Sequence, residues 1–204
     1  DQVYREMIDR GVNVQNVDDN NCIIDAPLGA APFRSRRKAK LYKIIPDMFD
    51  CDSEYYIWMD AYFELKMSPQ EIITKSGFAD SDSPIALFKH SQRDCVYEEM
   101  DVLKNIKYDH APALDMQKIF YESSLKHPAN GGLYECTCMI FDNSIKSKLF
   151  RLEWLSHINR FSSRDQVSLP VILRQMNITP HILEGKILPG FGDDNPYFVS
   201  LGNR

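Results

Sequence analysis

Short apolar runs alternate with amphipathic helical stretches along most of the chain, and this alternation limits the possible folds more than any other feature. Tyr55–Met59, Ile85–Phe88 and Leu133–Phe141 have the length and apolar content of buried strands. Between them, Cys95–Lys107 and Leu114–Leu125 place apolar residues at helical spacing. This order predicts an α/β domain of three layers, in which helices cover both faces of a mostly parallel central sheet.

The remaining predicted elements fit the same plan. Helices are expected at Gln2–Arg10, Ser35–Ile45, Pro69–Lys75, Leu149–Ile158 and Asp165–Met176, and short strands at Cys22–Asp25 and Phe63–Leu65. The aromatic content of Tyr55–Met59 predicts a buried central strand. The tail from Pro189 is rich in Gly, Asp and Pro, and no periodicity is visible in it.

Length and charge limit the organisation and the partners of the chain. Its 204 residues predict one domain over residues 1–204, and the start at Asp1 leaves open that this domain is a piece of a longer protein. The net charge of −5 gives no reason to expect nucleic acid or an anionic membrane as a partner. No run of 18 apolar residues is present, so we expect no transmembrane helix.

The five cysteines are too few and too scattered for a disulfide framework, which favours a reduced compartment. We therefore expect a cytoplasmic location, or the Golgi lumen if the sequence belongs to a larger membrane-anchored protein. Cys136 and Cys138 lie two residues apart in an apolar run and are expected to share one face of a strand. Buried small side chains explain this pair better than a zinc site.

Asp60 ends the most apolar of the predicted strands. Ligands of α/β sheets bind beyond the carboxyl ends of the strands, which is where Asp60 is expected to lie. An ionised carboxylate beside an apolar strand needs compensation, and Mg²⁺ and Mn²⁺ prefer oxygen ligands. Asp60 is therefore a candidate metal ligand, with a turn cap as the alternative.

Basic residues crowd the start of the helix upstream of Asp60. They are Arg34, Arg36, Arg37, Lys38 and Lys40. A helix N-terminus with cations beside it suits a phosphate group, although a solvated basic face explains the same charges.

Three further groups of polar residues have both a functional and a structural explanation. A cluster after Ile85–Phe88 fits either substrate binding or a network at a helix start, and it contains His90, Arg93, Asp94, Glu98 and Glu99. Asp165, between Arg164 and Gln166, fits either catalysis or an N-terminal cap. His181 is one of five histidines, and a structural role is its simplest explanation.

The order of these segments resembles that of retaining GT-A glycosyltransferases of the glycogenin type. In those enzymes a Lys-Leu pair precedes a strand that ends in an Asp-x-Asp metal motif, and an Asp-Gln pair and a histidine follow. The matching residues are Lys40-Leu41, the strand end Trp58-Met-Asp60, Asp165-Gln166 and His181.

A closer resemblance is to a family first catalogued as a domain of unknown function, whose plant members are linked to cell-wall and mucilage glycosylation. Its recurring segments stand here as Ile57-Trp-Met-Asp60, as His90-Ser-Gln-Arg93 with Tyr97 and Glu98 or Glu99, and as Phe161-Ser-Ser-Arg-Asp-Gln166. The resemblance covers residues 34–181. Large algal viruses encode glycosylation domains of similar size, which suggests one origin for such a chain.

The resemblance implies a GT-A-like domain that transfers a sugar from a nucleotide diphosphate, expected to be a UDP-sugar, to a hydroxyl group of a glycan or glycoprotein with retention of configuration. It also implies Mn²⁺ or Mg²⁺. Because Tyr62 replaces the second Asp of the metal motif, Asp60 would bind the metal together with His181 or a water molecule.

The site residues implied by the resemblance fall into three groups. For the donor they are Arg34, Arg37, Lys40, Asp60 and Ala61; for the sugar or acceptor, His90, Arg93 and Glu135; and for catalysis, Asp165 beside the anomeric carbon and Gln166 on the sugar or acceptor. Two rival functions remain open. A metal-dependent hydrolase or nucleotidyltransferase would use the same Asp60, and an inactive carbohydrate-binding domain would show no metal-dependent donor binding.

Overall fold

A computed structural model of the chain describes residues 13–18, 21–25, 31–106, 108–109, 111–188 and 192–201. Side chains are described from residue 36 onward, apart from 188, 192 and 193. The helix expected at Gln2–Arg10 lies outside the described residues. In the part of the chain that is described, no helix is both long and apolar enough to cross a membrane.

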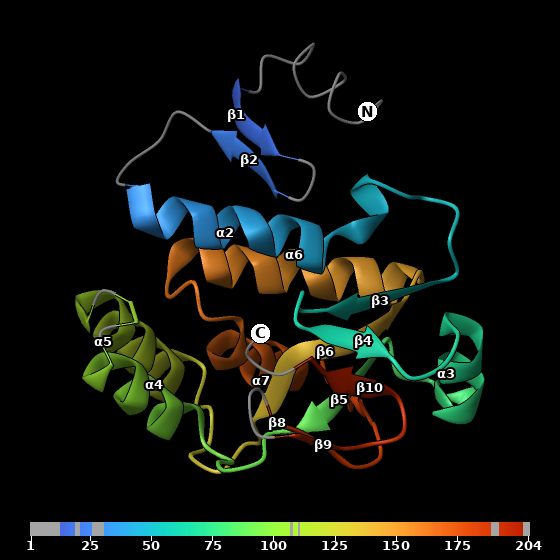
Figure 1. Ribbon diagram of the computed structural model, residues 1–204. Coiled ribbons are helices and arrows are strands. Elements are labelled where there is room, and N and C mark those ends of the chain that lie inside the picture. Colours follow the sequence, from blue (N-terminus) through green and yellow to red (C-terminus); the bar gives the residue numbers. More distant parts are fainter. Residues whose placement is uncertain are drawn as a thin grey trace.

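The central sheet has four strands in the order β3-β6-β5-β7 (Figure 1). They are β3 (Tyr55–Met59), β5 (Ile85–Lys89), β6 (Tyr134–Asp142) and β7 (His181–Ile182). β6 pairs antiparallel with β3 and with β5, whereas β5 and β7 pair in parallel. The α/β class is therefore confirmed, but the expectation of mostly parallel pairing is wrong. An apolar run predicts a strand without giving its direction, and β6 runs opposite to the other three.

The described helices follow the predicted order. They are α2 (Ala31–Ile44), α3 (Pro69–Lys75), α4 (Val96–Asn105), α5 (Ala111–Ile119), α6 (Ile145–Arg160) and α7 (Asp165–Gln175), with short helical turns at Pro46–Met48, Phe78–Asp80 and Phe120–Ser124. Helix α3 shows how local sequence sets an end. The Ser68 hydroxyl accepts from the Glu71 N–H, the Glu71 carboxylate accepts from the Ser68 N–H, and Pro69 begins the helix.

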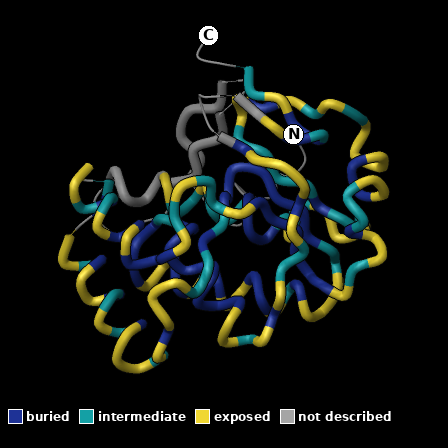
Figure 2. The backbone as a smooth tube through the Cα atoms, turned by 90° about the horizontal axis from the view of Figure 1, so that it is seen from below, coloured by how far each residue is buried: buried dark blue, intermediate teal, exposed yellow. Residues whose placement is uncertain are grey.

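One face of the sheet is covered by α2, α6 and α7 (Figure 1). Tyr56, Leu87 and Phe141 project from the sheet into this layer, where Phe150 and Trp154 of α6 are fully buried. Burying one large apolar side chain stabilises the fold by roughly 1.5–3 kcal/mol. Figure 2 shows buried residues gathered toward the middle of the molecule and exposed residues along the outer turns of the backbone.

The opposite face carries a smaller layer, composed of α3 and short strands. β4 (Phe63–Leu65) pairs antiparallel with β10 (Phe198–Ser200), and β8 (Lys186–Leu188) pairs with β9 (Gly192–Asp194). Phe63 and Phe198 are buried against Phe88 of the sheet. The three-layer arrangement is present, although the second outer layer is only partly helical. The tail provides two of these strands, which at three residues each are too short to show periodicity.

The N-terminal strands form a separate hairpin. β1 (Asn13–Asp18) pairs antiparallel with β2 (Asn21–Asp25), so the strand expected at Cys22–Asp25 is confirmed.

Two further expectations about the sheet are wrong. Among the described strands β3 is an edge strand, and Tyr56 is the only buried residue of its five. Cys136 packs with the helix-covered face, whereas Cys138 packs with the opposite face. The pairing register shifts between Leu87 and Phe88, which lie opposite this stretch. Such an irregularity breaks the two-residue alternation on which the expectation depended.

Candidate active site

Four segments bring polar side chains to one end of the strands of the sheet. β3 and β5 run in the same direction, so Asp60 and His90, which follow them, lie at the same end. The first residues of β6 reach this end, since Asp60 N–H donates to the Thr137 carbonyl oxygen at 2.9 Å and His90 N–H donates to that of Leu133 at 2.9 Å. Helix α7 begins beside them at Asp165.

Asp165 is held by two lysines of α2. Its Oδ2 lies 2.6 Å from Lys40 Nζ and 2.7 Å from Lys43 Nζ. The two lysines are three residues apart and therefore share one face of the helix. Burial by itself would raise the pKa of Asp165, but Lys40, Lys43 and Arg164 hold it far below its usual value. The carboxylate is therefore charged near neutral pH.

Lys43 is a buried ammonium group. Burial alone would lower its pKa, but the charges of Asp165 and Asp60 outweigh burial, and its pKa is raised above the usual value. Its Nζ lies 4.0 Å from Asp60 Oδ1 and 5.5 Å from the centre of the Trp58 ring. Lys43 thus links the two aspartates across α2, β3 and α7.

Asp60 is the most accessible carboxylate of the site. Trp58 Nε1 donates to its Oδ1 at 2.9 Å. Ala61 and Tyr62, which follow it, are exposed, and burial of the phenol together with the Asp60 charge raises the pKa of Tyr62 to about 12. Tyr62 is therefore a neutral phenol at the position where the metal motif would have its second carboxylate.

Glu99, in the first turn of α4, pairs with two arginines. Its Oε2 accepts from Arg93 Nε at 3.0 Å and lies 2.8 Å from Arg93 Nη2, and its Oε1 accepts from Arg164 Nε at 3.3 Å. Glu99 is buried, and both of its oxygens are occupied. It therefore fixes the two guanidinium groups relative to each other.

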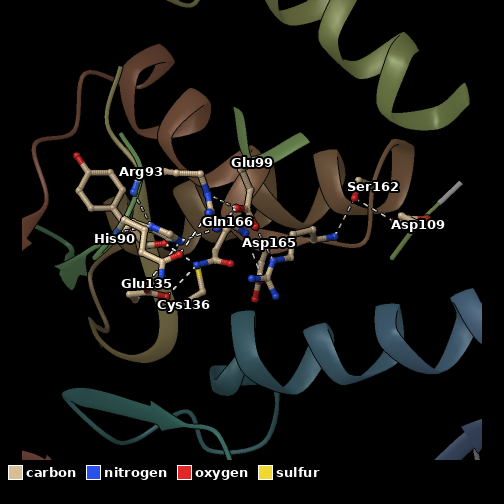
Figure 3. Close-up of polar contacts among 12 residues, drawn as sticks. His90, Arg93, Glu99, Asp109, Glu135, Cys136, Ser162, Asp165 and Gln166 are labelled. Carbon is tan, nitrogen blue, oxygen red and sulfur yellow. Dashed lines mark hydrogen bonds and ion pairs between the residues drawn. The ribbon is translucent and has the colours of Figure 1, made fainter. Parts of the chain in front are cut away.

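Glu135 lies between Gln166 and the loop after β5 (Figure 3). Gln166 Nε2 donates to its Oε2 at 3.0 Å, and Ser91 N–H donates to its Oε1 at 3.4 Å. Burial raises the pKa of Glu135, while burial and the charge of Arg93 lower that of His90. His90 Nδ1 accepts from the N–H of Arg93 at 3.1 Å, so its proton is on Nε2, which lies 3.7 Å from Glu135 Oε1.

The charged groups of the site differ in their exposure to solvent. Asp165, Glu99 and Glu135 are buried. The cations above them are partly exposed, with 15% of the Lys40 side chain, 23% of Arg93 and 32% of Arg164 open to solvent. The Asp60 side chain is 35% exposed and is the one accessible carboxylate among the four. Buried carboxylates that hold partly exposed cations form a surface suited to an anion.

Some of the expected donor residues have other roles or positions. Arg37 donates from Nε to the Ile158 carbonyl at 3.1 Å and from Nη2 to that of Phe161 at 2.6 Å, so it caps the C-terminal end of α6. The side chain of Arg34 lies outside the described residues. Asp165 is the first residue of α7 and Arg164 is its N-cap, but the Asp165 carboxylate still accepts a first-turn hydrogen bond, from the Gln166 N–H to its Oδ1 at 3.2 Å.

His181 lies far from Asp60. It pairs with Ala86 in β7, at the opposite edge of the sheet from β3, and three strand spacings separate the two strands by about 14 Å. Its Nε2 lies 2.7 Å from the Ser76 carbonyl oxygen. The expected metal pair of Asp60 and His181 is therefore wrong. Among the described residues, no group of three His, Cys, Asp or Glu side chains could hold a metal ion.

Lys43 is the residue of the site that the sequence analysis did not identify. The three-residue spacing from Lys40 is a signal that would have found it, because both side chains then lie on the same helical face. Glu99 and Arg164 were noted, but without their pairing. A cavity of about 420 Å³ lies on the opposite face of the sheet, where Tyr55, Ile57 and Met59 help to line it.

Comparisons with known proteins place these residues in a wider group. Residues 28–184 match the family model described as "TOD1/MUCI70, glycosyltransferase-like domain". A protein of Arabidopsis thaliana named "Probable hexosyltransferase MUCI70" is 28% identical over 145 residues, which cover 67% of this chain and 25% of that protein. The chain thus spans about a quarter of the length of this curated relative. No solved structure matches the chain.

Proposed function

The chain belongs to the TOD1/MUCI70 glycosyltransferase-like family, and from this membership we propose that it moves a sugar from a nucleotide diphosphate to a hydroxyl group of a glycan or glycoprotein. The name of the Arabidopsis relative, a probable hexosyltransferase, supports a hexose as the transferred sugar. A UDP donor and retention of configuration belong to the proposal through the resemblance to glycogenin-type enzymes.

The observation that carries this proposal is the group of partly exposed cations above the buried carboxylates. When the sugar leaves, negative charge develops on the diphosphate, and cations fixed before the reaction stabilise that charge in the transition state. Lys40, Arg93 and Arg164 suit this role because Asp165 and Glu99 already hold them in place. Among the residues proposed to bind the donor, Arg164 takes the place that was expected for Arg37, because Arg37 caps α6.

The carboxylates have different roles in this proposal. Asp60 is open to solvent, so it can accept hydrogen bonds from hydroxyl groups of the donor. Asp165 is buried beneath Lys40 and Lys43, which favours fixing these lysines over contact with the anomeric carbon. Glu135 and His90, with Gln166 behind them, follow the same ends of the strands, but their side chains are 7% and 6% exposed, which favours supporting the sugar or acceptor site over direct contact with its hydroxyl groups.

Replacing Lys40 tests the diphosphate contact. A charge-assisted hydrogen bond contributes about 1.5–3 kcal/mol, so Lys40→Ala should weaken UDP and UDP-glucose roughly ten- to hundred-fold in calorimetric titrations. Binding of uridine, which has no phosphate, should stay the same. Lys104→Met is the matched control, because it removes a lysine that pairs with two aspartates away from the site.

Two outcomes would contradict the proposal. If uridine loses as much affinity as UDP in Lys40→Ala, the lysine supports the fold and does not contact the phosphates. If the unaltered chain binds UDP-sugars but transfers no sugar in a panel of glycan acceptors, the carbohydrate-binding alternative is favoured. Release of free sugar or phosphate without transfer would instead favour a hydrolase.

A further inference from the structure

The carboxylates near the candidate active site leave few oxygen atoms for a metal ion. Both oxygens of Glu99 are paired with arginines, and Oδ2 of Asp165 contacts two ammonium groups. Glu135 is occupied by Gln166 and the loop after β5, and Oδ1 of Asp60 accepts from Trp58. The metal site that the family resemblance implies is therefore not formed by these side chains.

The residues that would complete such a site are absent or distant. Tyr62, a phenol, stands where the metal motif would have its second carboxylate, and His181 lies across the sheet at hydrogen-bonding distance from the Ser76 carbonyl. Mg²⁺ and Mn²⁺ are held in proteins by oxygen ligands, commonly one or two carboxylates together with waters and substrate phosphates, and of the four described carboxylates of the site only Asp60 is accessible.

A cation is already built into the protein at this place. The ammonium group of Lys43 is buried between Asp165, at 2.7 Å, and Asp60, at 4.0 Å, with Lys40 on the same oxygen of Asp165. A divalent ion between these aspartates would lie close to two ammonium groups and would be repelled by both. The ammonium group of Lys43, beneath that of Lys40, gives the leaving diphosphate a fixed positive charge.

We infer that the site works without a divalent cation, and that the buried ammonium of Lys43, fixed between Asp165 and Asp60, takes the place that a metal ion has in related enzymes that use one. This inference rests on the proposed function, because it states how charge on a diphosphate is balanced. Lys43 is a positioning residue here: it acts through the two aspartates and through Lys40, which reaches the phosphates.

UDP binding with and without metal gives the first test. Calorimetric titration of the unaltered chain with UDP should give the same affinity, within about twofold, in EDTA and in excess Mn²⁺. Binding that needs Mn²⁺, or that Mn²⁺ strengthens about tenfold or more, would overturn the inference.

Direct Mn²⁺ binding gives a second test that needs no donor. The electron paramagnetic resonance signal of free Mn²⁺ should be unchanged by the unaltered chain and by Lys104→Met, and reduced by Lys43→Met, in which the two aspartates lose their buried cation. Lys43→Arg keeps the charge and should bind no Mn²⁺. Stoichiometric Mn²⁺ binding by the unaltered chain that disappears in Asp60→Asn would overturn the inference.

UDP titration and Mn²⁺ binding together distinguish a failure of the proposed function from a failure of this inference. If the chain binds no UDP under any condition, the proposed function fails, while the Mn²⁺ measurement still decides whether these aspartates hold a metal. If Lys43→Met does not fold, as judged by circular dichroism, the comparison between the unaltered chain and Asp60→Asn remains decisive.

Discussion

Two lysines of this chain each lie between two aspartates, yet their surroundings differ. They are Lys43, with Asp165 and Asp60, and Lys104, with Asp101 and Asp115. The Lys43 side chain is 4% exposed and that of Asp165 3%, whereas Lys104 is 25% exposed and Asp115 57%. Lys43 and Asp165 join α2 to α7 in the candidate active site, whereas Lys104 and Asp115 join α4 to α5 at the surface.

The difference shows that the energetic contribution of an ion pair depends on how much water surrounds it. Water and salt screen the charges around Lys104, and exposed pairs of this kind contribute about 0–1 kcal/mol. Around Lys43 water is largely excluded, so removing one partner leaves a buried charge that has fewer groups to stabilise it and no water to replace them. The buried pair is thus costly to disturb, whether or not it adds net stability over an apolar alternative.

The largest effect is expected from Lys43→Met. Breaking a buried ion pair costs about 3–5 kcal/mol, and because Lys40 still contacts Asp165 we expect about 3 kcal/mol of unfolding free energy to be lost. Urea unfolding measures this. The double variant with Asp165→Asn should recover part of the loss, since it removes the buried carboxylate charge that has lost one of its two lysines. A loss below about 1 kcal/mol would make Lys43 equivalent to a surface lysine.

A pH-dependent effect is expected from Asp165. Its folded-state pKa is depressed below the unfolded value of about 3.9, so the stabilisation is fully present above that pH and is lost as the pH falls through the folded-state pKa. The stability difference between the unaltered chain and Asp165→Asn should therefore be constant near neutral pH and shrink below about pH 4. A difference that stays constant down to the lowest pH at which the chain folds would show that the charge of Asp165 contributes nothing.

The smallest effect is expected from Lys104→Met. Its unfolding free energy should fall by about 0–1 kcal/mol, and that loss should become smaller in high salt as the exposed charges are screened. Chemical unfolding at low and high ionic strength measures both values. A loss as large as that of Lys43→Met would show that burial does not explain the contrast between the two lysines.

Most of the longer elements, but only part of the site, could be predicted from the sequence. β3 has the bounds expected from Tyr55–Met59, and α3 has those expected from Pro69–Lys75, because apolar spacing and capping residues act over a few positions. The position of Lys40, Asp60 and Asp165 at one place was expected from the family resemblance. The pairing of His181 with Asp60 was also expected from it and is wrong.

The sequence by itself indicated the longer strands and helices, because periodicity and caps depend on neighbours along the chain, but it did not indicate short strands such as β7, β9 and β10. Only the tertiary structure decided that β6 runs against β3 and β5, that Cys136 and Cys138 separate onto two faces, and that Lys43 is buried between two aspartates. Lys40 and Asp165 are 125 residues apart in sequence. Whether such charges meet depends on how α2 and α7 pack against the sheet, and whether the contact matters depends on the water that this packing removes.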